Sequence, residues 1–146
     1  MMNHRSHIDI NRPVSDVFTY VSNLENIPRW QSEVVTSRVT SPGSMRVGLT
    51  FEENVKLFGR TFQNVCEVTE YLPTRRFAFK STSGTPFRYT GSFSFEANGR
   101  GTKLTLSVES ALMGFWKIFE PIARMEMKNG IEGELKTLKS ILETNS

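Results

Sequence analysis

Between Glu33 and Leu112, apolar and polar side chains alternate with a period of two, which restricts this stretch of the chain to β-strands. Turn-forming residues interrupt the alternation at Ser41-Pro42-Gly43, Phe58-Gly59, Leu72-Pro73, Ser83-Gly84 and Asn98-Gly99-Arg100-Gly101. The segments between these breaks are about 9 to 13 residues long, and Asn98-Gly99 is a strong hairpin signal. The pattern therefore predicts six antiparallel strands joined in order.

A further strand and two short helices are expected before this region. Residues 4–10 alternate weakly and precede Pro13, which suits the first position of a helix. The apolar residues that follow at helical spacing are Val14, Val17, Phe18 and Val21. A second short helix over residues 23–30 is expected to stop at or before Pro28.

Helical spacing returns after the strands, over residues 115–143. An apolar stripe on one face of this helix consists of Ile131, Leu135, Leu138 and Leu142. Pro121 predicts a kink or a helix start just before it, and Gly130 and Gly133 permit a close approach to the backbone. Because no other predicted element is long enough to cover the sheet, we expect an α+β fold. In this fold, a curved seven-stranded antiparallel sheet wraps around the long C-terminal helix, with two short helices after the first strand.

Composition narrows the class of protein. The 146 residues suit a single domain over 1–146, and the scattered charges, with a net charge of +3, argue against a nucleic-acid-binding surface. The single cysteine, Cys66, excludes an intramolecular disulfide and a cysteine-based zinc site. The sequence contains no apolar run of the ~18–20 residues that a membrane span needs and no apolar core of a secretory signal near its start. We therefore expect a cytoplasmic protein without an integral membrane segment.

The 11 phenylalanines, against 3 tyrosines and 2 tryptophans, predict either a bulky packed core or an apolar ligand cavity. Strand parity supplies candidates for the inward face. Phe87, Tyr89, Phe93 and Phe95 share one face of their strand. Leu104, Leu106 and Val108 do so on the next strand, and Phe77 and Phe79 on a third.

Glu53 shares a face of its strand with Val47, Leu49, Phe51 and Val55. A carboxylate buried there without a partner would be costly or would have a raised pKa. Either a local bulge turns Glu53 out to solvent, or Glu53 is a polar contact inside a ligand cavity. Asn64, between Phe62 and Cys66 on the neighbouring strand, poses the same question.

The sequence offers little for catalysis. The two histidines, His4 and His7, lie near the N-terminus without a third inward ligand, so no metal site is expected. Cys66 on an apolar strand is more typical of a packed thiol than of a nucleophile. No cofactor motif is present. Glu53, Tyr89 and Glu126 remain as candidates for acid–base chemistry, which needs positioned groups with shifted pKa values.

Five stretches in the same order resemble the START-like (SRPBCC) superfamily, near its polyketide cyclase/dehydrase and lipid-transport branch. They are 10–18 (opening strand and helix), 27–31 (second helix), 68–77 (mid-sheet hairpin), 101–104 (turn into the last strand), and 119–125 with 135–139 (closing helix). The resemblance implies a helix-grip fold with a hydrophobic cavity between sheet and last helix. Members bind lipids, sterols, polyketides, plant hormones or quinones, some cyclise or dehydrate polyketides, and others are co-chaperone activators. The superfamily shares no catalytic motif, so no catalytic residue is carried over.

Three hypotheses follow. The first is a cavity that binds, and in some proteins transports, a small hydrophobic ligand such as a lipid, a polyketide or another aromatic or isoprenoid metabolite. The second is an enzyme of the cyclase or dehydratase type that uses an inward carboxylate. The third is a protein-interaction module with an exposed apolar patch at residues 112–116, which could equally be a lid. Each of the three hypotheses also allows the protein to form a homodimer. The expected ligand contacts are Phe51, Glu53, Phe62, Asn64, Phe87, Tyr89, Phe93, Trp116, Phe119 and Met125, with Met127 near the entrance.

Overall fold

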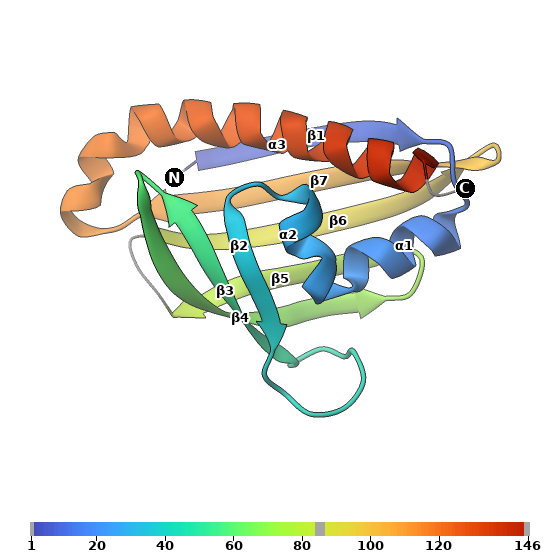
Figure 1. Cartoon of the computed structure of the whole chain (residues 1–146), viewed down its shortest axis with the longest axis horizontal. Coiled ribbons are helices and arrows are strands. Elements are labelled where there is room, and N and C mark those ends of the chain that lie inside the picture. The colour runs from blue at the N-terminus through green and yellow to red at the C-terminus, as the bar shows by residue number, and fades with distance from the viewer. Residues whose placement is uncertain (1, 84–86, 145–146) are drawn as a thin grey trace.

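The computed structural model describes residues 2–83 and 87–144 and shows one antiparallel sheet gripping a long helix (Figure 1). The strands are β1 (Met2–Ile10), β2 (Val34–Val39), β3 (Thr50–Leu57), β4 (Arg60–Leu72), β5 (Arg76–Ser83), β6 (Phe87–Asn98) and β7 (Gly101–Leu112). The helices are α1 (Val14–Ser22), η1 (Leu24–Asn26), α2 (Ile27–Trp30), η2 (Gly114–Phe119) and α3 (Glu120–Thr144). The seven strands lie in the order β1-β7-β6-β5-β4-β3-β2, so the predicted fold is confirmed.

The six strands expected between Glu33 and Leu112 are present as β2 to β7, each antiparallel to its neighbour. Four of the five expected breaks fall between strands, while Gly84 of the fifth lies outside the described residues. The expectation for Val47 was wrong, because this residue precedes β3 in the β2–β3 loop and is exposed. The sheet's inward face therefore begins at Leu49 and Phe51.

Two expectations for the prolines need correction. The helix does not stop at Pro28, since this residue lies in the first turn of α2, where a missing N–H leaves no helical hydrogen bond unmade. Pro13 lies one position before α1, where its carbonyl oxygen accepts hydrogen bonds from the N–H groups of Asp16 and Val17. Pro121 lies in the first turn of α3, as the sequence predicted.

The C-terminal half of α3 completes the core. The predicted stripe of Ile131, Leu135, Leu138 and Leu142 is buried against the sheet. Across the same core, Phe18 of α1 packs edge-on against Phe95, with ring centroids 5.0 Å apart. This half of the interior is filled with apolar side chains.

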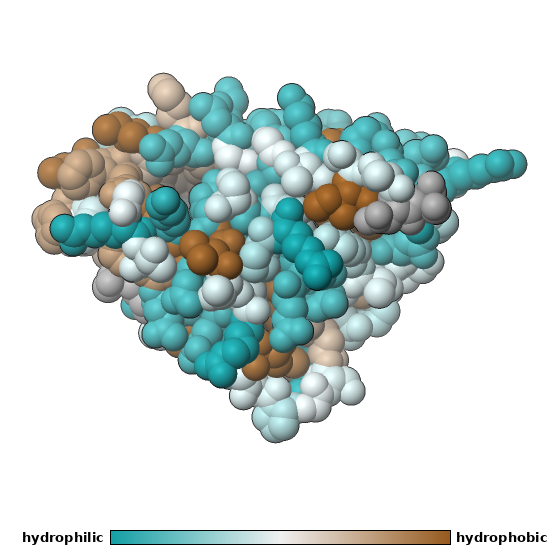
Figure 2. Space-filling model, in the orientation of Figure 1, coloured by the Kyte–Doolittle hydropathy of each residue, from teal (hydrophilic) through white to brown (hydrophobic). Residues whose placement is uncertain are grey.

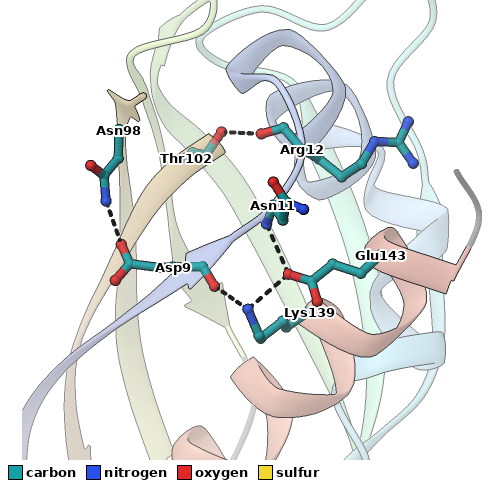
Figure 3. Close-up of polar contacts among 7 residues, drawn as sticks. All are labelled: Asp9, Asn11, Arg12, Asn98, Thr102, Lys139 and Glu143. Carbon is teal, nitrogen blue, oxygen red and sulfur yellow. Dashed lines mark hydrogen bonds and ion pairs between the residues drawn. The ribbon is translucent and has the colours of Figure 1, made fainter. Parts of the chain in front are cut away.

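Polar contacts fasten the same end of α3 to the end of β1 (Figure 3). The Lys139 ammonium donates hydrogen bonds to the carbonyl oxygen of Asp9 and to Glu143, whose carboxylate also accepts the N–H of Asn11 at 2.8 Å. On the neighbouring hairpin, the Thr102 hydroxyl donates to the carbonyl oxygen of Arg12 at 2.8 Å. The helix is thus fixed at its C-terminal half, and its N-terminal half extends over the open end of the curled sheet.

Candidate functional site

A cavity of about 240 Å³ lies between the concave face of the sheet and the N-terminal half of α3. The helix contributes Ala123, Glu126, Met127, Ile131 and Glu134 to its wall. The β3–β4 hairpin rises toward the same part of α3 (Figure 1) and contributes Lys56, Leu57 and Phe58. The remaining lining residues are Met2, Gln31, Glu33, Val34, Glu53, Val55, Phe79, Phe87, Tyr89, Gly91, Phe93, Leu106, Val108, Ser110 and Leu112.

The sequence of α3 explains why the cavity lies under this half of the helix. Leu135, Leu138 and Leu142 fill the space beneath the C-terminal half. The N-terminal half presents the small Ala123 and the flexible Met127 instead, with Gly130 at the point where the two halves meet. A cavity of this volume suits a small organic molecule.

Phe58 closes one end of the cavity through an unusual backbone conformation. Its φ angle of 55° lies in the left-handed region, which a bulky residue adopts only when its surroundings favour it. The Phe58 ring stacks on Trp116 of η2, with centroids 5.5 Å apart and planes within 6°, and contacts Phe119 at 5.2 Å. This aromatic cluster joins the hairpin tip to the segment that leads into α3.

Glu53, Tyr89 and Cys66 form a buried polar cluster on the cavity wall. The Tyr89 hydroxyl donates a hydrogen bond to Glu53 Oε1, and Cys66 Sγ lies 3.1 Å from the same hydroxyl and 3.9 Å from Glu53 Oε1. Glu53 is only 2% exposed, and β3 pairs with β4 without interruption from Thr50 to Leu57. The alternative of a bulge that turns Glu53 out to solvent is therefore wrong.

Burial shifts the proton affinities of this cluster. It raises the pKa of Glu53 from 4.5 to about 7, although the hydrogen bonds from Tyr89 and Cys66 act in the opposite direction. Burial and the neighbouring carboxylate raise the pKa of Cys66 to about 12 and that of Tyr89 well above 10. Near neutral pH, Glu53 can thus exist with or without its proton, while Tyr89 and Cys66 keep theirs.

A pair of carboxyl groups, Glu33 and Glu134, also lines the cavity. Glu134 of α3 lies near Glu33, which comes from the loop between α2 and β2; oxygens of both carboxyl groups lie within 4 Å of the position that a Cβ atom of residue 130 would take. Burial, the neighbouring Glu33 and the charge of Glu53 raise the pKa of Glu134 to about 10. Gly130 makes room for the pair, since a Cβ atom at this position would lie 2.5 Å from Glu33 Oε1.

Two buried polar side chains on adjacent strands have atoms without a hydrogen-bond partner among the residues described. Glu53 Oε2 is one such atom, and both side-chain atoms of Asn64 are also unpaired. Glu53 and Asn64 are directly opposed in the β3–β4 pairing. Buried polar atoms are normally paired, so Glu53 on the cavity wall and Asn64 within the sheet layer have unused hydrogen-bonding capacity.

The structure brings together four of the ten expected ligand contacts. Glu53, Phe87, Tyr89 and Phe93 line the cavity. Phe51 and Asn64 are fully buried in the sheet layer without lining it. The other four occupy different places: Phe62, Trp116 and Phe119 belong to the aromatic cluster around Phe58, and Met125 points outward with 67% of its surface exposed.

Sequence reasoning missed Glu33 and Glu134, which face the cavity. Glu134 could have been found, because it lies three residues after Ile131 and one before Leu135, on the edge of the buried stripe. Glu33 follows a short helix whose direction depends on the whole fold, and no local pattern marks it. Met127 lines the cavity, whereas the neighbouring Met125 does not.

An exposed apolar patch lies beside the cavity, on η2 and the first turns of α3. Figure 2 shows hydrophobic side chains gathered at this end of the molecule. The patch consists of Phe115, Ile118, Ile122 and Met125, of which Ile118 is 74% exposed. Leu112, by contrast, is buried. The patch is therefore centred after the 112–116 segment expected from the sequence, and it is compatible with a lid and with an interaction surface.

His4 interacts with a carboxylate of α3, since its Nε2 atom lies 3.2 Å from Glu132 Oε1. Within residues 2–83 and 87–144, the structure shows no group of three His, Cys, Asp or Glu side chains that could hold a metal ion. None of the helices in this described part combines the length and apolar character needed to cross a membrane.

Comparisons with known proteins agree with the fold described above. The sequence profile described as "Polyketide cyclase / dehydrase and lipid transport" matches residues 1–143. No curated protein sequence matches the chain.

Among solved structures, TTHA0849 from Thermus thermophilus is similar over 99% of both chains, with 22% identity and a TM-score of 0.83. A START superfamily protein from Mycobacterium smegmatis is similar over 100% of both chains, with 14% identity and a TM-score of 0.85. The Zhui aromatase/cyclase from Streptomyces sp. R1128 aligns with 97% of this chain and 93% of its own, with 10% identity and a TM-score of 0.79. At these identities, the similarity shows a common fold.

Proposed function

The chain belongs to the polyketide cyclase/dehydrase and lipid transport family, and on this basis we propose that its cavity binds a small hydrophobic molecule. The observation that carries the proposal is the cavity under α3, whose walls are mainly aromatic and aliphatic with polar side chains among them. Ligand sites in proteins typically have this composition. Lipids, polyketides and other aromatic or isoprenoid metabolites small enough for the cavity are the candidate ligands. A protein that binds such a ligand and releases it unchanged would act in its transport.

Octan-1-ol is a suitable probe because its eight-carbon chain and single hydroxyl match a small apolar cavity. Burial of eight carbon groups contributes about 6 kcal/mol at roughly 0.8 kcal/mol each, which corresponds to a Kd of tens of micromolar. Isothermal titration calorimetry measures this affinity directly. Native mass spectrometry of the purified protein, followed by solvent extraction, identifies a ligand that remains bound during purification.

A matched pair of variants on β7 distinguishes the cavity from other surfaces. Val108 lines the cavity, and Ser107 lies on the opposite face of the same strand. Val108→Phe fills part of the cavity and should weaken octanol binding at least tenfold, while Ser107→Phe should bind like the unmodified protein. Equal affinities of the two variants, with both folded by circular dichroism, would contradict the proposal.

A second candidate function is an acid–base enzyme of the dehydratase or cyclase type. The observation in its favour is Glu53, a cavity-lining carboxyl group whose pKa of about 7 suits both loss and gain of a proton. In a dehydration, the Glu53 carboxylate would take a proton from the carbon beside a carbonyl. The protonated Glu53 would then return it to the departing hydroxyl group, which leaves as water.

Glu53→Gln separates the two candidates once a bound molecule has been identified. An enzyme would turn that molecule over, and the Glu53→Gln variant would lose this turnover even at saturating concentrations of the molecule. A binding protein would show no turnover in either form.

The proposal includes a cytoplasmic location, where a single buried thiol such as Cys66 stays reduced.

A further inference from the structure

The charged side chains that line the cavity are mostly of one sign. Four glutamates, Glu33, Glu53, Glu126 and Glu134, face it among the described residues, against the single cation Lys56. Lys56 and Glu126 are exposed and stand at the rim. Glu53 and Glu134 are buried, and Glu33 is half-buried. The inner part of the cavity is therefore acidic.

Three elements that are far apart in the sequence bring these inner carboxyl groups together. Glu53 comes from β3, Glu33 from the loop before β2, and Glu134 from the middle of α3. Glu134 and Glu33 approach the same point beside Gly130, and the negative charge of Glu53 also raises the pKa of Glu134. Gly130 permits the approach of Glu33 to the helix, because any larger residue would displace its carboxylate.

Glu53 also presents an unused acceptor. Its Oε1 atom accepts the Tyr89 hydroxyl, but its Oε2 atom has no partner among the described residues and less than 1 Å² of exposed surface. The residue lines the cavity while being 2% exposed. A small movement of the Glu53 carboxylate toward the cavity would let a donor on a bound molecule pair with this atom, and a positively charged donor would do so most strongly.

We propose that the natural ligand is an amphiphilic amine, whose ammonium group pairs with Glu53 and the Glu33–Glu134 pair while its apolar part fills the space under α3. This inference rests on the proposed function and specifies its ligand class. A carboxylate or phosphate headgroup would instead place a negative charge beside three glutamates, with Lys56 at the rim as the lining cation. A negative headgroup would gain no ion pair with these carboxyl groups, whereas an ammonium group pairs with their ionised form.

The titratable groups around Glu53 also predict that binding of an amine releases protons. Tyr89 and Cys66 contact Glu53 from β6 and β4, Glu134 of α3 interacts with its charge, and Glu33 from the α2–β2 loop lies beside Glu134. Near pH 7, part of the Glu53 population and most of Glu134 carry a proton, since their pKa values are about 7 and about 10. Binding of an ammonium ion favours the carboxylate form, so the released protons pass to the buffer.

Three eight-carbon probes with different headgroups test the inference. Octylamine, octan-1-ol and octanoate have the same apolar chain, and calorimetry at pH 8 compares their affinities. We expect octylamine to bind about tenfold more tightly than octanol, as one charge-assisted hydrogen bond would give, and octanoate to bind more weakly than either. Titrations in two buffers of different ionisation enthalpy should show protons released on octylamine binding but not on octanol binding.

Glu53→Gln and Glu134→Gln should each lower octylamine affinity about tenfold and leave octanol affinity within threefold. Glu132→Gln is the matched control, because Glu132 lies on the outward face of the same helix and loses the same charge. Equal binding of octylamine and octanol, or tighter binding of octanoate, would overturn the amine inference and leave the proposed function standing. If none of the three probes binds, the proposed function itself fails.

Discussion

Replacing Glu53 with Gln should make the protein more stable than the unmodified form at alkaline pH. Gln has nearly the same shape and keeps the oxygen that accepts the Tyr89 hydroxyl, but it carries no charge. Burial raises the pKa of Glu53 in the folded protein from 4.5 to about 7, so folding favours the protonated side chain. The contribution of Glu53 to stability is therefore fully present below pH 4.5 and is lost as the pH rises toward 7.

The size of the effect follows from the two pKa values. At roughly 1.4 kcal/mol for each pH unit between 4.5 and about 7, the unmodified protein loses about 3 kcal/mol that the Gln variant does not lose. Above pH 7 the difference stays constant. The two proteins should differ little at pH 4.5, and the variant should be more stable by about 3 kcal/mol at pH 8.

Urea unfolding followed by circular dichroism, repeated from pH 4.5 to 8.5, measures the difference in unfolding free energy directly. Glu52→Gln is the matched control, since Glu52 lies on the opposite face of the same strand and pairs with Arg38 at 2.9 Å. The control should shift the curve by less than about 1 kcal/mol without the pH-dependent gain. Parallel curves for the unmodified protein and Glu53→Gln would refute the argument that Glu53 is buried and shifted.

Three further results are expected. Gly133→Ala should stabilise the protein by up to about 1 kcal/mol in urea unfolding, since a Cβ atom there meets nothing within 4 Å. Gly130→Ala should stabilise it less, because the new Cβ atom displaces the Glu33 carboxylate, and a larger gain at Gly130 would contradict this packing. In the folded protein at pH 8, Cys66 should resist a thiol reagent such as DTNB, because it is buried and its pKa is raised to about 12. It should react fully in urea, and rapid labelling of the folded protein would contradict this prediction. Leu138→Ala should cost about 2–5 kcal/mol in urea unfolding, since the side chain is fully buried in the filled half of the core, and a cost below about 1 kcal/mol would show that this half is not tightly packed.

The antiparallel strands β2 to β7 and the buried stripe of α3 could be predicted from the sequence because both depend on local periodicity, whereas the pairing of β1 with β7 is set by the whole fold. Alternation over Phe87–Phe95 and Leu104–Val108 identified the inward residues of β6 and β7, and all of them are buried or half-buried. The presence of Glu53 on an apolar face also marked a special position. Val47 did not follow the alternation, because the strand begins only at Thr50.

The pairing of Glu53 with Tyr89 could not be predicted in the same way. Two strands, β4 and β5, separate β3 from β6, so in a flat sheet the two residues would lie roughly 14 Å apart at about 4.8 Å for each strand spacing. Only the curl of the sheet and the length of both side chains bring the tyrosine hydroxyl to the carboxylate. The approach of Glu33 to Glu134 likewise depends on where α3 crosses the sheet.

One physical reason explains why some of the predicted ligand contacts do not line the cavity. Parity gives the face on which a residue lies but not its position along the long axis of the molecule. Phe62 faces inward at the tip of the β3–β4 hairpin, where it packs on Trp116 at 5.9 Å instead of on the cavity. In α3, a difference of two residues, from Met125 to Met127, turns the side chain from the solvent to the cavity.

The most direct test of the central claim is a methyl NMR titration with octan-1-ol. Methyl groups of Leu106, Val108, Met127 and Ile131 line the cavity, whereas those of Ile118, Ile122 and Met125 belong to the exposed patch. A ligand in the cavity should shift the first set in a saturable manner, give intermolecular nuclear Overhauser effects to them, and leave the second set unchanged. Shifts confined to the exposed patch, or no shifts at millimolar octanol, would contradict a ligand-binding cavity under α3.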